Sequence, residues 1–238
     1  MYRDVRKVGE FALTQHNDST KRSVNNMIKA ILWDFGGVIT TSPFEAFNRY
    51  EVEHGIPLDF IRTINATNPE KNAWALFESN RITFGEFDRL FSEETSRAGY
   101  PISGCDVLKK LSGDIRPRMV YAIEECKRRF KVGCITNNVN SDQRSVMDRA
   151  RDRDEEIQRV MGLFDIVVES SKEGIRKPDP EIYRLAISRL KVDAGQIVFL
   201  DDLGINLKPA KALGMQTIKV VNECQALKEL EQITGLIF

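Results

Sequence analysis

Short apolar runs alternate with amphipathic stretches along most of the chain. The strand-like runs occupy 28–34, 131–136, 164–168, 197–201 and 216–221. Apolar positions recur at helical spacing from Pro117 onward and in the stretches 141–161, 180–190 and 206–213. Strands that alternate with helices in this way predict βαβ units and an α/β fold, with a parallel sheet covered by helices on both faces.

Helical patterns fill the segment between the first two strand-like runs. Aromatic residues recur three apart there, and Thr83 with Glu86 forms the sequence of a capping box. A helical block of this size between two strands predicts an inserted subdomain. We therefore expect a polar N-terminal extension over 1–27, a core made of 28–43 and 117–238, and an all-helical insertion over 44–116.

Charge and cysteine content exclude several classes of protein. Lys and Arg number 35 and Asp and Glu also number 35, a balance that argues against nucleic acid or a membrane surface as a partner. No apolar run approaches the ~18 residues of a membrane span. Four scattered cysteines without a metal-ligand spacing suit a reducing compartment, so we expect a cytoplasmic protein. The sequence does not indicate an oligomeric state.

Polar residues follow several of the expected strands at their carboxyl ends, where parallel sheets bind ligands. Asp34 ends the first strand, Thr136 and Asn137 end the second, and Asp201 with Asp202 ends the fourth. Lys177 precedes the helix that Pro180 begins. Taken singly, each of these residues has an ordinary structural explanation, such as a helix cap or a solvated loop. Their joint placement predicts one polar crevice.

These residue types together suit metal-assisted phosphoryl transfer. Carboxylates are the hard oxygen ligands that Mg²⁺ uses, together with waters and phosphate oxygens. A hydroxyl, backbone N–H groups and a lysine can hold the remaining phosphate oxygens. An aspartate can itself attack phosphorus and form an aspartyl-phosphate. The expected substrate is a small phosphorylated metabolite, and the expected cofactor is Mg²⁺.

Four motifs give the chain a resemblance to the haloacid dehalogenase (HAD) superfamily over about 28–238. They are W-D-F-G-G-V-I at 33–39, C-I-T-N-N at 134–138, G-I-R-K-P-D-P at 174–180 and V-F-L-D-D-L-G-I-N-L-K-P-A-K-A-L-G-M at 198–215. The last resembles the N-terminal phosphatase domain of soluble epoxide hydrolases and the HAD domain of acyl-CoA dehydrogenase fusions. The resemblance implies a Rossmann-like three-layer core and a helical cap of the C1 type.

The resemblance also implies roles for the strand-end residues. Asp34 matches the nucleophile, Thr136 and Asn137 match the phosphate-binding pair, and Lys177 matches the lysine that neutralises the phosphoryl group. The implied Mg²⁺ ligands are Asp34, Asp202 and the main-chain carbonyl of Gly36. Asp201 and Asn206 take supporting positions.

One position departs from the family pattern. Most phosphatases of the family have an aspartate two residues after the nucleophile, as general acid and base, and this chain has Gly36. General acid–base catalysis typically contributes ~10²–10⁴ in rate. We therefore expect a hydrolase of the phosphoric monoester type that favours activated leaving groups. Two alternatives stay open: a phospholigand-binding or partner-binding module without turnover, and hydrolysis of a carbon–halogen bond.

Overall fold

Five strands form one parallel sheet in the computed structural model, which describes residues 27–110, 113–138 and 151–238. The strands are β1 (Ala30–Trp33), β2 (Lys131–Thr136), β3 (Ile166–Glu169), β4 (Ile197–Asp201) and β5 (Gln216–Lys219). All the neighbouring pairs are parallel, as the sequence predicted. The expected extension over 1–27 lies, except for its last residue, outside the described part of the chain.

The strand order places a switch point at the centre of the sheet. The order is β3-β2-β1-β4-β5, so the chain moves outward from β1 to β3 and then returns to the other side of β1. Trp33 at the end of β1 pairs with Cys134 of β2 and with Leu200 of β4. The carboxyl ends of β1, β2 and β4 are therefore adjacent, where a doubly wound sheet opens a crevice.

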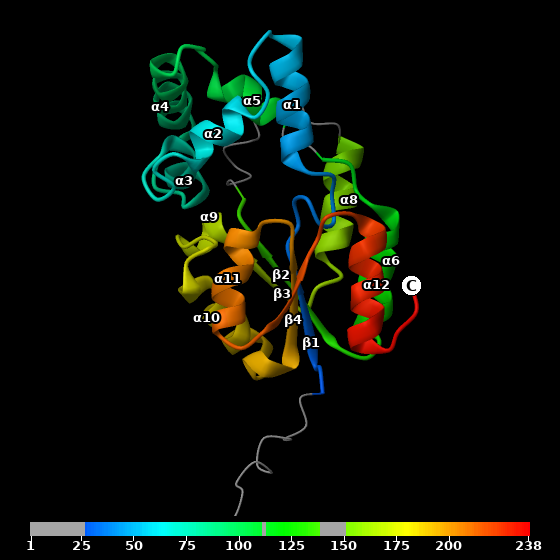
Figure 1. Ribbon diagram of the computed structural model, residues 1–238. Coiled ribbons are helices and arrows are strands. Elements are labelled where there is room, and N and C mark those ends of the chain that lie inside the picture. The colour runs from blue at the N-terminus through cyan, green and yellow to red at the C-terminus, as the bar shows by residue number, and fades with distance from the viewer. Residues whose placement is uncertain (1–26, 111–112, 139–150) are drawn as a thin grey trace, which may run out of the picture.

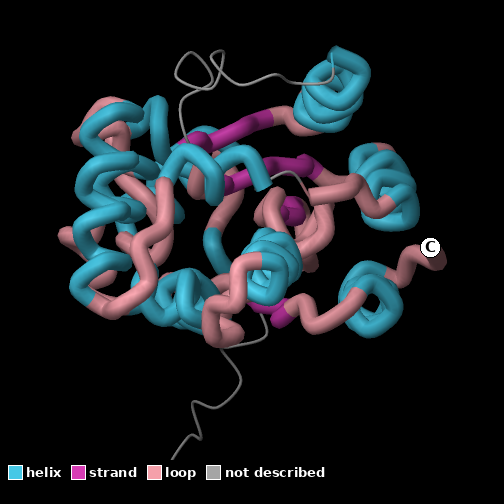
Figure 2. Tube along the Cα trace, turned by 90° about the horizontal axis from the view of Figure 1, so that it is seen from above, coloured by secondary structure: helices cyan, strands magenta, loops and turns pink. Residues whose placement is uncertain are grey.

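Helices cover both faces of the sheet, which gives the three layers of a Rossmann-like core (Figures 1 and 2). On one face lie α6 (Pro117–Lys127), α8 (Arg151–Met161) and α12 (Glu223–Thr234), and on the other lie α10 (Pro180–Leu190) and α11 (Gly204–Ala212). The short α9 (Ser170–Glu173) lies between β3 and α10, and the short η1 (Ala194–Gln196) lies between α10 and β4. Side-chain alternation along β1 explains the layers, because Ile31 and Trp33 join one apolar cluster and Ala30 and Leu32 join the other.

The remaining helices stand beyond the carboxyl ends of the strands (Figure 1). They are α1 (Pro43–Glu53), α2 (Phe60–Ala66), α3 (Ala73–Glu78), α4 (Phe84–Arg97) and α5 (Gly104–Lys110), and we call them the helical block. The block has its own apolar cluster, in which the Trp74 ring meets Phe47 and Phe87 edge-on. The predicted capping box of Thr83 and Glu86 begins α4. Two segments join the helical block to the core. They pair with each other in an isolated antiparallel β-bridge between Thr40 and Ile115.

Helices α12 and α11 differ from the sequence-based helix assignments. Helix α12 was not expected, although Asn222 and Gln225 form a capping box at its start. Helix α11 begins two residues earlier than predicted, at Gly204. Of the expected helix over 141–161, residues 151–161 are described and are helical. No helix among the described residues is both long enough and apolar enough to cross a lipid bilayer.

Candidate active site

Asp34 is the first residue beyond β1, and hydrogen bonds hold both its backbone and its side chain. Its N–H donates to the carbonyl of Leu200 at 2.8 Å, which extends the pairing of β1 with β4. Its Oδ1 accepts the N–H of Phe35 at 2.7 Å, and the residue is only 7% exposed. The side chain is thus fixed by backbone groups at the switch point of the sheet.

Lys177 bridges two of the expected site carboxylates. Its Nζ lies 2.7 Å from Asp34 Oδ1 and 2.7 Å from Asp201 Oδ2, and the residue is 1% exposed. Burial by itself would lower the pKa of this ammonium group, but Asp201 and Asp34 outweigh burial and raise it. The two carboxylates therefore favour the charged form of this buried lysine.

Asn137 fixes the backbone of Lys177 from the end of β2. Its Nδ2 donates to the Lys177 carbonyl at 3.0 Å, and its Oδ1 accepts the Lys177 N–H at 2.9 Å. Thr136, the last residue of β2, is buried beside it. The structure thus joins the second and third motifs through a reciprocal pair of hydrogen bonds, and Asn137 positions the lysine.

Both oxygens of Asp201 are occupied by donors. Oδ1 accepts the N–H of Leu203 at 2.8 Å, Oδ2 faces Lys177, and Asn206 Nδ2 lies 3.1 Å from each oxygen. The residue is completely buried. Asp201 therefore binds Lys177 directly, and Asn206 holds Asp201.

Asp202 is the carboxylate that remains available on the crevice side. Carboxylate oxygens of Asp34, Asp201 and Asp202 all lie within 4.8 Å of one another. Burial, with Asp201 adding to it, raises the pKa of Asp202 to about 6. Burial also raises the pKa of Asp34 well above its usual range, against the influence of Lys177, and Asp201 and Asp202 add to the rise.

This charge balance fits a divalent cation. Three carboxylates and one ammonium carry an excess of negative charge when all are ionised, and burial, with the neighbouring carboxylates adding to it, raises the pKa of Asp34 and of Asp202. Oxygen ligands of this kind suit Mg²⁺. Because the donors around Asp201 leave it little capacity for a further ligand, Asp34 and Asp202 are the carboxylates suited to a metal.

Two adjacent glycines shape the loop that follows Asp34. A Cβ on Gly37 would lie 2.2 Å from Asp202 Oδ2, and its φ is +76°. Only glycine therefore lets this loop approach the carboxylate so closely. A Cβ on Gly36 would meet Pro43 at 3.8 Å, an ordinary contact, and its φ lies outside the left-handed region.

Three further residues support the site but escaped the sequence interpretation. Tyr183 donates its hydroxyl to the Asn206 carbonyl at 2.7 Å, inside the core. Arg116 Nη1 lies 3.0 Å from the carbonyl of Gly37, where it braces the glycine loop. Gly37 has no role of its own in the sequence interpretation beyond its place in the first motif. These contacts join segments far apart in the sequence, so spacing within a motif gives no signal for them.

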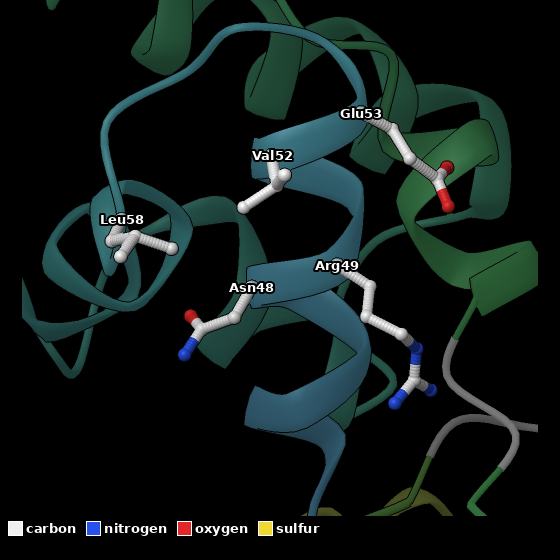
Figure 3. Close-up of a pocket in the computed structure, with 5 residues that line it drawn as sticks. All are labelled: Asn48, Arg49, Val52, Glu53 and Leu58. Atoms are coloured by element: carbon white, nitrogen blue, oxygen red, sulfur yellow. The ribbon is translucent and has the colours of Figure 1, made fainter.

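A surface hollow of about 350 Å³ lies elsewhere, on the outer side of α1 (Figure 3). Its lining consists of Asn48, Arg49, Val52, Glu53 and Leu58. It contains none of the strand-end residues. The hollow is therefore separate from the carboxylate cluster.

The fold and the site together define a Rossmann-like α/β protein whose polar centre lies at the switch point of its sheet. Comparison with known proteins identifies the family within this class. The chain belongs to the haloacid dehalogenase-like hydrolase family, whose sequence model matches residues 28–214. The resemblance in the four motifs is thereby confirmed, and the chain is a member of a family of hydrolases.

Three curated relatives are similar to this chain in sequence. Mouse acyl-CoA dehydrogenase family member 10 is 34% identical over 87% of this chain and 19% of its own length. Rat bifunctional epoxide hydrolase 2 is 40% identical over 89% of this chain and 40% of its own length. A sesquiterpene phosphatase of Aspergillus oryzae is 29% identical over 87% of this chain and 97% of its own length. The chain thus spans less than half the length of the first two.

A solved structure shares the fold. A HAD family enzyme of Bacteroides thetaiotaomicron, in complex with magnesium and inorganic phosphate, superposes with a TM-score of 0.56. The match covers 82% of this chain and 96% of the other, at 21% identity. At this level of identity the likeness establishes the shared fold.

Proposed function

We propose that this chain is a Mg²⁺-dependent phosphatase that acts on a small phosphorylated molecule through an aspartyl-phosphate at Asp34. The observation that carries the proposal is the buried Lys177, which lies 2.7 Å from Asp34 and beside the carboxylate cluster. The relative from Aspergillus oryzae, a phosphatase of nearly the same length, supports the reaction type.

The side chains divide the work of the proposed first step. Phe35 N–H and Lys177 both hold Oδ1 of Asp34, so we assign attack on phosphorus to Oδ2. A bond forms between Oδ2 and phosphorus while the bond to the leaving oxygen breaks, and that oxygen leaves with the electron pair. Lys177 balances charge on the phosphoryl oxygens, and electrostatic stabilisation of this kind is usually the largest catalytic term.

We assign the Mg²⁺ ligands to Asp34, Asp202 and the main-chain carbonyl of Gly36. When bound, the ion supplies Lewis-acid stabilisation of the phosphoryl oxygens. Thr136 and Asn137 are the proposed phosphate-binding pair at the end of β2. In the second step water hydrolyses the aspartyl-phosphate, which releases inorganic phosphate and restores Asp34.

Gly36 decides which substrates suit this site. It carries no group that can protonate a leaving oxygen or deprotonate water, so a substrate whose leaving group departs as an anion is favoured. Acyl phosphates, anomeric sugar phosphates and aryl phosphates meet that requirement. The same glycine is the observation that favours a second candidate function, a phospholigand-binding module without turnover.

We also propose that residues 44–116 act as a cap over the crevice. Their separate apolar cluster and their position beyond the strand ends support this (Figure 1). Hydrogen exchange with Mg²⁺ and beryllium fluoride tests the proposal, because a closing cap gains protection when the phosphate analogue binds. A reducing location such as the cytoplasm agrees with the four free cysteines.

A phosphorylated-metabolite panel, assayed with and without Mg²⁺, tests the function. We expect Mg²⁺-dependent release of inorganic phosphate, no turnover in Asp34→Asn, and weaker Mg²⁺ binding in Asp202→Ala. Full activity in Asp34→Asn would overturn the mechanism. Binding of phosphate esters by a folded wild-type protein without turnover would favour the second candidate, and halide release from a haloacid would point to the dehalogenase reaction.

A further inference from the structure

The helical block meets the core at Glu78, the last residue of α3. Its carboxylate lies 2.8 Å from Arg176 Nη2, and its Oε1 accepts the indole N–H of Trp74 at 2.9 Å. Its main-chain carbonyl accepts the Ser170 hydroxyl at 2.8 Å, and Arg176 Nη1 also donates to the carbonyl of Pro69. One residue of the block is thus bound to the core through both its side chain and its backbone.

Both core partners of Glu78 adjoin the segments that hold the site. Arg176 directly precedes Lys177, whose backbone is paired with Asn137. Ser170 Oγ accepts the N–H of Asn138 at 3.0 Å, at the end of the segment that carries Asn137. The ion pair of Glu78 with Arg176, the peptide bond from Arg176 to Lys177 and the hydrogen bonds of Ser170 therefore connect the helical block with the lysine and with the end of β2.

The ion pair at this junction is shielded from water. The side chains of Arg176 and Glu78 are 24% and 13% exposed, whereas those of Arg89 and Glu93 in the same block are 62% and 41% exposed. Exposed pairs contribute little to stability, and removal of one partner from a shielded pair leaves an uncompensated charge. The pairing of Glu78 with Arg176 is therefore able to fix the geometry of both segments.

We propose that Glu78 is a positioning residue that makes the placement of Lys177 depend on docking of the helical block. The inference rests on the proposed function for the role of Lys177. With α3 docked, Arg176 and Ser170 are both held, and the segment 174–178 keeps its register against Asn137. Without that contact, Lys177 is held only by its carboxylate partners and by Asn137.

A double-mutant cycle measures this coupling. The variants are Glu78→Gln, Arg176→Gln and both together, with Glu93→Gln as a matched control on the exposed surface of the block. Turnover of an aryl phosphate with Mg²⁺ gives kcat and KM, and hydrogen exchange follows residues 73–79 and 174–178. Arg176→Lys is the conservative variant, which retains the positive charge.

We expect Glu78→Gln to lower kcat about tenfold with KM nearly unchanged, less than the ~10²-fold that a misplacement of 1 Å can cost. Exchange at 174–178 should rise. Arg176→Gln should have the same effect, the double variant should be no worse than either, and Arg176→Lys should recover part of the activity. Glu93→Gln should match the wild type.

Other results would contradict either the role of Glu78 or the proposed function. An unchanged kcat in Glu78→Gln, whether or not exchange rises within α3, overturns the inference, because the pair is then only structural. If the wild type hydrolyses nothing, the proposed function fails instead. The coupling is then judged with Mg²⁺ and inorganic phosphate as probe. The coupling is supported if Mg²⁺ and inorganic phosphate lower hydrogen exchange at 174–178 in the wild type but not in Glu78→Gln. Any other result refutes it.

Discussion

Replacing Gly36 by aspartate tests the chemistry at the position where this chain departs from its family. The structure leaves room for the change. A Cβ at this position would meet Pro43 Cγ at 3.8 Å and Cδ at 3.9 Å, and the backbone is outside the left-handed region. The substitution therefore adds a carboxyl group with little backbone strain, so a change in rate reports on proton transfer.

The new carboxyl group would stand two residues after Asp34, in the loop that approaches Asp202. Asp34 and Asp202 lie in the same cluster, and burial and neighbouring carboxylates raise the pKa of both. A general acid contributes ~10²–10⁴ in rate, which corresponds to about 2.7–5.4 kcal/mol at 1.36 kcal/mol per decade. We expect Gly36→Asp to raise alkyl-phosphate turnover by about 10², the lower end of that range.

The assay is a leaving-group series from alkyl to aryl to acyl phosphates. In the wild type, log kcat should fall steeply as the pKa of the leaving group rises, because departure occurs without protonation. Gly36→Asp should flatten that slope and leave the activated substrates nearly unchanged. Gly36→Asn is the matched control, since it has the same size and no carboxyl proton.

Two results would refute this reasoning. A wild type without any leaving-group dependence would show that the missing acid does not limit the reaction. A folded Gly36→Asp that gains nothing on alkyl phosphates would show that another group already supplies the proton. An equal gain in Gly36→Asn would assign the effect to packing.

Three further predictions concern the groups around the site. Gly37→Ala should weaken Mg²⁺ binding ~10–100-fold in calorimetric titration, because its Cβ would displace Asp202, and unaltered affinity would contradict the close approach. Tyr183→Phe should lower the free energy of unfolding in urea by about 0.5–1.5 kcal/mol, because the Asn206 carbonyl loses the hydrogen bond from the Tyr183 hydroxyl; no loss would show that the bond contributes nothing. When a chelator removes Mg²⁺, Asp202 should bind its proton more tightly in the folded protein than in the unfolded chain, because burial raises its pKa to about 6. The free energy of unfolding should therefore fall as pH rises from 3.8 to about 6. Asp202→Asn should flatten that decline in urea titrations, and an unchanged pH slope would exclude Asp202 as its source.

The sheet was predictable because its strands are short, apolar and buried. All five runs proved to be strands, and the parallel arrangement followed from their alternation with helices. Helix α12 was missed although Ala226, Leu227 and Leu230 recur at helical spacing and are buried. Apolar spacing of this kind is typical of an amphipathic helix, and the capping box of Asn222 and Gln225 adds a start signal.

The meeting of the strand-end residues was predictable for a topological reason. Parallel strands bring their carboxyl ends to one edge, so Asp34, Thr136 and Asp201 had to be neighbours once β1, β2 and β4 were adjacent. The contacts of Glu78 were not predictable, because Ser170 and Arg176 lie in the core about ninety or more residues further along the chain. Such pairs follow from the packing of the helical block on the core, which no local pattern encodes.

The two adjacent aspartates illustrate how one strand end serves two needs. Asp201 is still part of β4, where its side chain is buried and meets Lys177, Asn206 and the N–H of Leu203. Asp202 is the next residue along, partly exposed, and it approaches the backbone of Gly37. Asp34 meets Lys177 and is also a proposed metal ligand, so its charge is shared between two cations. The D-D pair adds one carboxylate for each cation, because Asp201 binds Lys177 and Asp202 remains for the proposed metal.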